Sequence, residues 1–130
     1  MGTLRDLLAY KKAFALAMAI FEVTKVFPKE EIYSLTDQNR RSSRSINANL
    51  AEAYRRRKYP NHFLSKLADA DTENAETQTW LDFALACKYI SEQEYRQLYD
   101  QGEEIAKLLH YMITNPDKFL LKSMIKAPIS

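Results

Sequence analysis

The stretch YKKAFALAMAIFEVTKVFP, residues 10–28, indicates the fold class of the chain. Its apolar side chains recur every three or four positions, which is the spacing of one face of an α-helix. That face comprises Tyr10, Ala13, Phe14, Ala17, Ile20, Phe21 and Thr24. Pro28 ends the pattern, because the residue before a proline is biased away from helical geometry. We therefore predict a first helix over residues 4–27.

Three more helical segments follow, separated by short breaks at Tyr59-Pro60 and around Ser91. The predicted ranges are 34 or 36 to 58, 61–89 and 91–115. Connections this short make neighbouring helices antiparallel. The sequence therefore predicts an all-α, up-down-up-down four-helix bundle over residues 1–116, with a tail over residues 117–130.

Composition supports one small domain and excludes several classes of protein. The 130 residues include only two Gly and four Pro, too few for the many turns of an all-β fold. The longest apolar run has nine residues, whereas a membrane span needs about 20, so no membrane is expected. The single cysteine, Cys87, rules out an internal disulfide and suits a reducing cytoplasm. We expect it to be buried beside Trp80 and Phe83.

The first predicted helix has a second apolar sector besides the face described above. This sector comprises Leu8, Leu16, Val23, Val26 and Phe27. A helix that is apolar around much of its circumference is buried on several sides. A partner subunit explains this pattern, and the alternative is that residues 119–125 fold back over the helix.

Polar side chains interrupt the apolar pattern in the middle of the bundle. From residue 38 to 45 the second helix has no aliphatic side chain, and the facing part of the third helix is also polar. We predict that Arg41 pairs with Glu76 across this seam. Asn49 and Gln78 would satisfy the remaining groups, because an unpaired buried charge is costly.

Basic side chains are concentrated on the second predicted helix. Residues 35–60 hold seven Lys and Arg against two acids. Aligned cations can follow the phosphates of a nucleic acid, and neighbouring aromatic rings such as those of Tyr54 and Tyr59 can stack on unpaired bases. The predicted RNA- or DNA-contacting residues are Arg40, Arg44, Arg55, Arg56, Arg57 and Lys58.

Acidic side chains provide the competing interpretation. Residues 66–105 hold ten Asp and Glu against three Lys and Arg, and the net charge of the chain is only +2. These acids can neutralise the basic helix within one subunit or between subunits. In that case the protein is a structural adaptor that recruits a protein partner.

Enzymatic chemistry finds little support in the sequence. His62 and His110 lie on different predicted helices, and neither has a second histidine at the helical spacing of a metal site. We predict no catalytic residue, no metal site and no cofactor.

Several long motifs resemble one known family. They are RDL (5–7), FPKEEIYSL (27–35), QNRRSSRSINANLAEAYRR (38–56), ETQTWLDFALACKYIS (76–91) and MITNPDKF (112–119). Together they resemble the four helix bundle protein family, also called the 23S rRNA-intervening sequence proteins, over essentially the whole chain. Ala53 departs from the pattern, since the family usually has Gly there.

The resemblance implies a non-enzymatic antiparallel bundle that assembles as a homopentamer. The family is distantly similar to the accessory subunit of diversity-generating retroelements, which binds nucleic acid and a reverse transcriptase. We therefore expect a cytoplasmic homo-oligomeric binding or scaffold protein. Its expected partners are further copies of itself, RNA or DNA, and an unidentified protein.

Overall fold

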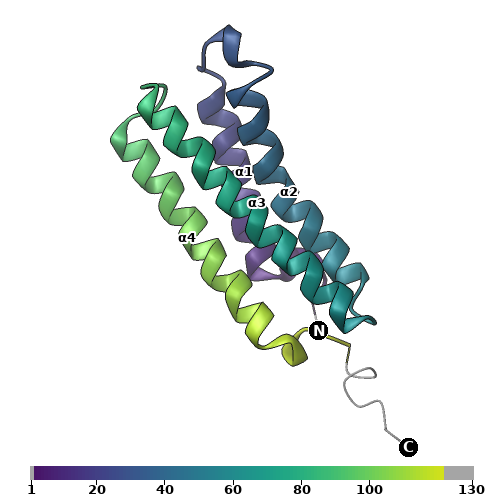
Figure 1. The fold of residues 1–130 in the computed structure, drawn as a ribbon. Coiled ribbons are helices and arrows are strands. Elements are labelled where there is room, and N and C mark those ends of the chain that lie inside the picture. Colours follow the sequence, from purple (N-terminus) through teal and green to yellow (C-terminus); the bar gives the residue numbers. More distant parts are fainter. Residues whose placement is uncertain (1, 122–130) are drawn as a thin grey trace, which may run out of the picture.

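The structure, a computed structural model, describes residues 2–121 and consists of four long helices joined by short turns. The helices are α1 (Leu8–Thr24), α2 (Leu35–Arg55), α3 (Pro60–Ala86) and α4 (Glu92–Thr114). Three single 3-10 turns accompany them, η1 (Leu4–Asp6), η2 (Lys29–Glu31) and η3 (Pro116–Lys118). Sequential helices run antiparallel along one long axis (Figure 1). The predicted all-α class and four-helix arrangement are confirmed.

The ends of the helices differ from the predicted ranges. α1 begins at Leu8 because the preceding residues form η1, and the amide of Thr3, the residue before η1, donates to the Asp6 carboxylate over 2.9 Å. α2 ends at Arg55, three residues early. Arg56, Arg57 and Lys58 form a turn instead, which leads into Tyr59 and Pro60, and Tyr59 takes the extended geometry that a following proline favours.

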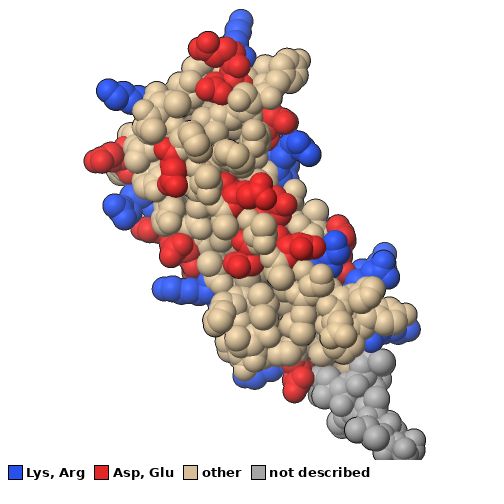
Figure 2. Space-filling view, viewed as in Figure 1, with Lys and Arg blue, Asp and Glu red and all other residues tan. Residues whose placement is uncertain are grey.

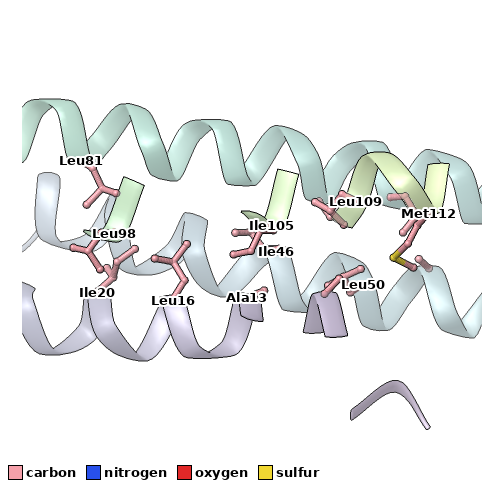
Figure 3. Packing of buried hydrophobic residues seen from close by; sticks show 14 of the residues in the cluster. Ala13, Leu16, Ile20, Ile46, Leu50, Leu81, Leu98, Ile105, Leu109 and Met112 are labelled. Atoms are coloured by element: carbon pink, nitrogen blue, oxygen red, sulfur yellow. The ribbon is translucent and has the colours of Figure 1, made fainter. Parts of the chain in front are cut away.

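An apolar core fills the space between the four helices. Figure 3 shows side chains from all four helices meeting there. The labelled members are Ala13, Leu16, Ile20, Ile46, Leu50, Leu81, Leu98, Ile105, Leu109 and Met112, which are all at most 4% exposed. Of the face predicted on the first helix, Ala13, Ala17, Ile20 and Thr24 are buried, whereas Phe14 is exposed.

A layer of small polar side chains interrupts this core midway along the bundle. Thr77 on α3 donates a hydrogen bond to the Ser42 hydroxyl on α2 over 2.9 Å. Asn74 on α3 donates to the Gly102 carbonyl on α4, also over 2.9 Å. Asn39 is fully buried, and its amide has no hydrogen-bond partner among residues 2–121. The polar seam exists, but charged side chains do not form it.

The second apolar sector predicted on α1 divides into buried and exposed residues. Leu16 and Phe27 belong to the core, whereas Leu8 is 50% exposed and Val26 is 78% exposed. Phe14, expected on the inward face, is 53% exposed. The structure therefore leaves apolar side chains of α1 on the outside of a single subunit.

The start of the predicted tail packs against the bundle. Leu120 joins the core, and the Phe119 ring lies edge-on to Tyr111 of α4, with ring centroids 6.2 Å apart. This contact is at the end of α4, and the rest of the proposed fold-back segment, residues 122–125, lies outside the described residues.

Candidate nucleic-acid interface

Four consecutive cations lie where α2 ends and α3 begins. Arg55 is the last residue of α2, and Arg56, Arg57 and Lys58 form the turn that precedes α3. We call these four residues the basic turn. Three of them are exposed and Arg57 is half-buried. Because the turn is short, the four charges are held close together at one end of the bundle.

An open groove of about 420 Å³ lies beside the basic turn. Its lining residues are Glu52, Arg55, Arg56, His62, Ser65 and Lys66. The Lys66 ammonium pairs with Glu52 at 3.1 Å and with Asp69 at 3.5 Å. The hydrogen bond to Glu52 raises the pKa of Lys66 above its ordinary value, so this cation is already compensated. Arg55 and Arg56 supply the free positive charge of the groove.

Aromatic rings flank the basic turn on both sides. The Arg57 guanidinium lies over the Tyr54 ring, 4.3 Å from its centroid, and its Nε donates to the Tyr54 carbonyl over 3.0 Å. Burial raises the pKa of the Tyr54 phenol above its ordinary value. On the other side, the rings of Tyr59 and His62 lie 5.9 Å apart.

The other two predicted contacts, Arg40 and Arg44, lie elsewhere. Both guanidinium groups pack on the Phe21 ring of α1, with carbon-to-centroid distances of 4.8 and 5.8 Å. The Nε of Arg40 also donates to the Thr24 hydroxyl over 2.7 Å. Arg40 precedes Arg55 by about 22 Å along the helix. The prediction of one helical patch that includes Lys58 is wrong, because α2 ends before Lys58.

None of these six cations has a carboxylate within 4.0 Å among the described residues. Neutralisation by acids of the same subunit is therefore not found in this part of the chain. Pairing with acids of another subunit stays a prediction.

Comparison with known proteins places the chain in a family. The sequence model for the 23S rRNA-intervening sequence protein matches residues 5–111. The chain belongs to this family. A crystal structure from Bacteroides thetaiotaomicron VPI-5482, described as a protein with unknown function from the S23 ribosomal protein family, is 29% identical in sequence, with a TM-score of 0.77. The match covers 85% of this chain and 99% of that one. A search of curated proteins gives no significant match.

In this 23S rRNA-intervening sequence protein the predicted Arg41–Glu76 ion pair does not form. Arg41 is 76% exposed, and its nearest carboxylate, at 3.8 Å, is that of Asp37 one turn earlier. Glu76 is exposed as well. The prediction is wrong because the helices are rotated so that Ser42 and Thr77 point inward in place of the charged neighbours Arg41 and Glu76.

The other two members of the predicted network bond elsewhere. The Asn49 amide donates to the Ser45 carbonyl of its own helix over 2.9 Å. The Gln78 amide donates to Tyr99 and Glu103 of α4, so it joins α3 to α4 and does not reach α2. The prediction missed five buried polar residues, and the sequence signal for them is the apolar spacing of their own helix, set by Ile46, Leu50 and Ala53 on α2 and by Phe63, Leu67 and Ala70 on α3. They are Asn39, Ser42, Ser43, Asn74 and Thr77.

Acidic side chains gather in a second groove, between α2 and α3. Asp37, Glu73 and Glu76 line it together with Arg41 and Trp80. Burial raises the pKa of Glu73, and the neighbouring carboxylates Glu76 and Asp69 raise it further. Figure 2 shows acidic side chains gathered midway along the visible face of the bundle. The family member thus has separate basic and acidic surfaces.

Groups that could support catalysis or metal binding are dispersed. Within residues 2–121 no three His, Cys, Asp or Glu side chains are placed to hold a metal ion. Cys87 is exposed, contrary to the expected burial, because it follows the last residue of α3. None of the described helices is both long and apolar enough to cross a bilayer.

Proposed function

We propose that this protein is a non-enzymatic, homo-oligomeric binding or scaffold protein that contacts the phosphate backbone of RNA or DNA through the basic turn. One observation supports this most strongly: the turn has four adjacent cations that lack a carboxylate partner among the described residues. Cations that neutralise phosphates release condensed counterions, which is the main source of affinity for a nucleic-acid backbone.

The groove offers hydrogen-bond donors that suit phosphate groups but do not distinguish one base from another. Arginine presents a planar fork of N–H donors that matches phosphate oxygens, and Arg55 and Arg56 line the same groove. The Ser65 hydroxyl offers a further donor. Contacts of this kind position a nucleic acid but carry no information about its bases. Arg44, exposed and about 16 Å before Arg55, can meet the same strand at a second point.

The homo-oligomeric part of the proposal rests on the exposed apolar side chains of α1. Phe14 and Met18 are one helical turn apart, and both are about half exposed, as is Leu8. Phe14 and Met18 therefore share one side of α1 and present apolar surface that a second helix can cover. The number five comes from the resemblance to the family. Exposed Cys87 suits the reducing conditions of the cytoplasm, where we place the protein.

A second candidate function is a structural adaptor that recruits a protein partner. The acidic groove between α2 and α3 favours it, because Asp37, Glu73 and Glu76 present negative charge to a basic segment. In this case the basic turn pairs with acids of a neighbouring subunit, and nucleic acid is not bound.

Native mass spectrometry of protein purified without nuclease tests both candidates at once. The proposed function predicts an oligomer, five subunits if the resemblance extends to assembly, with bound nucleic acid that is lost at high salt. A monomer without nucleic acid under gentle, low-salt conditions would contradict it. A defined protein bound in a stoichiometry that nuclease does not alter would favour the adaptor.

A further inference from the structure

We propose that the ligand of the basic turn is single-stranded, with an unpaired base stacking on Tyr59. This inference rests on the proposed function, because it specifies the nucleic acid that the same site takes. Its basis is an exposed aromatic pair, Tyr59 and His62, directly beside a groove lined by two uncompensated arginines.

The aromatic pair lies in open solvent. Tyr59, just before α3, is 54% exposed, and His62 in the first turn of α3 is exposed too. Their rings are 5.9 Å apart and inclined by 48°. A base that stacks on an exposed ring removes the apolar faces of both from water, which favours binding there. Base stacking on aromatic rings is sequence-tolerant because every base has a π-face.

The backbone fixes Tyr59 before any ligand arrives. Its amide donates to the Arg56 carbonyl over 2.8 Å, and its own carbonyl accepts from the Phe63 amide over 2.9 Å. The following residue, Pro60, restricts the backbone further. A ring on a prearranged backbone binds with less loss of conformational entropy than one on a loose loop.

The second ring at the turn is already occupied. The Arg57 guanidinium covers Tyr54 at 4.3 Å, and the Tyr54 side chain is half-buried against the core. Tyr54 therefore cannot offer a free face in the way that Tyr59 does. This difference assigns stacking to Tyr59, while Arg57 contributes positive charge.

His62 links the two parts of the site. Its ring contacts Tyr59, and its side chain lines the groove with Arg55 and Arg56. A phosphate bound by the arginines would therefore lie next to the ring pair. This placement suits a single strand, in which a phosphate and the neighbouring base must bind side by side. In a duplex the bases are paired and stacked inside, so a duplex can use only the phosphate half of the site.

The experiment compares fluorescently labelled strands by anisotropy at low salt. The probes are oligo(U) and oligo(dT) of about 12 nucleotides, within the range of one small single-strand site, and an RNA duplex of the same length. We expect the wild-type protein to bind both single strands more tightly than the duplex. RNA and DNA strands should differ little, because ring faces and phosphates are common to both.

Substitution of the ring separates stacking from charge. Tyr59→Leu should weaken single-strand binding roughly tenfold and leave duplex binding unchanged, whereas Tyr59→Trp should retain it. The matched control is Tyr33→Leu, since Tyr33 is 93% exposed and lies at the opposite end of the bundle. Circular dichroism confirms that each variant is folded.

The two levels of the proposal fail in different ways. If the wild-type protein binds none of the probes, the proposed function is wrong and this inference falls with it. If binding is salt-sensitive but equal for strand and duplex, and Tyr59→Leu has no effect, only the stacking inference is overturned.

Discussion

The side-chain amide of Asn74 on α3 donates a hydrogen bond to the main-chain carbonyl of Gly102 on α4, over 2.9 Å and away from solvent. Gly102 lies at a close approach of the two helices. A Cβ atom at this position would lie 2.9 Å from Cγ and Nε2 of Gln78. The missing side chain therefore leaves space for Gln78, which donates to Tyr99 and Glu103 of α4.

The first prediction concerns this approach. In a Gln78→Ala background, Gly102→Ala should raise the free energy of unfolding by about 1 kcal/mol, the usual gain in a helix interior. In the wild-type background the gain should disappear, because the new methyl group displaces Gln78 from its acceptors. Urea unfolding of the four proteins measures the coupling. Equal effects in both backgrounds would show that Gln78 moves aside without cost.

The second prediction concerns Asn39, whose buried amide has no partner among the described residues. Asn39→Val should raise the free energy of unfolding by about 1 kcal/mol, because it removes a polar group that is buried without compensation. Asn47→Val is the matched control. Its amide donates to the Tyr10 carbonyl over 3.0 Å, so this variant should lose about 1 kcal/mol. A loss of stability in both variants would indicate that Asn39 has a partner in solution.

Sequence patterns predicted the helices well because local signals mark them. Pro28, Pro60 and Pro116 lie at or just beyond breaks, and Ala13, Ala17, Ile20 and Thr24 of the predicted face of α1 are buried. The rotation of α2 and α3 was harder to predict. Arg41 and Ser42 are neighbours on α2, and Glu76 and Thr77 are neighbours on α3. From the sequence, the sector of the charged residue and that of the small polar residue were therefore both plausible as the inward face. Packing of Ser42 against Thr77 decides between them, and only tertiary structure contains that contact.

The candidate site was predicted only in part, and the reason is related. Arg56, Arg57 and Lys58 continue a good helical pattern, and nothing local shows that Arg55 is the last helical residue. Likewise, Arg40 was expected to point outward with the other cations. Its contacts with Phe21 and Thr24 come from α1, 16 or more residues away in sequence, so no local pattern on α2 reveals them.

The third prediction tests this division of the cations. Arg40→Ala should lower the free energy of unfolding by about 1 kcal/mol, because it removes the hydrogen bond to Thr24 and the packing on Phe21. Arg44→Ala removes only a longer contact with Phe21, at 5.8 Å, and no hydrogen bond to Thr24, so it should change stability by less than about 0.5 kcal/mol. Thermal or urea unfolding measures both. Equal stability of the two variants would show that the hydrogen bond from Arg40 to Thr24 contributes nothing measurable.

The fourth prediction concerns two tyrosines bonded to carboxylates. Tyr89 donates to Glu31 over 2.8 Å and Tyr95 donates to Asp82 over 2.6 Å, and these bonds raise the pKa of each phenol to about 12. Since the folded-state pKa lies above the ordinary value of 10.0, the bonds stabilise the fold below pH 10. This stabilisation is lost as the pH rises from 10 to 12.

Ultraviolet titration of the tyrosinate band checks that expectation. The chain has eight tyrosines, and Tyr89 and Tyr95 should ionise late, together with the half-buried Tyr54, with Tyr89→Phe removing one of the late steps. For Glu31 the pKa shift has the opposite direction, because the hydrogen bond from Tyr89 lowers the pKa of this carboxyl below 4.5. The bond therefore stabilises the fold above pH 4.5, and this stabilisation is lost as the pH falls further. A single ionisation step for all tyrosines near pH 10 would contradict these contacts.

The salt dependence of single-strand binding tests the central claim, that the basic turn neutralises phosphates, most directly. The affinity of wild-type protein for oligo(U) should fall steeply between about 50 and 200 mM salt. Arg55→Gln with Arg56→Gln should reduce the slope of log affinity against log salt by about 1.4, because each phosphate contact on a single strand contributes about 0.7. Lys29→Gln with Lys88→Gln removes the same charge at the opposite end and should leave the slope unchanged. Equal slopes for both double variants and the wild type would contradict the account.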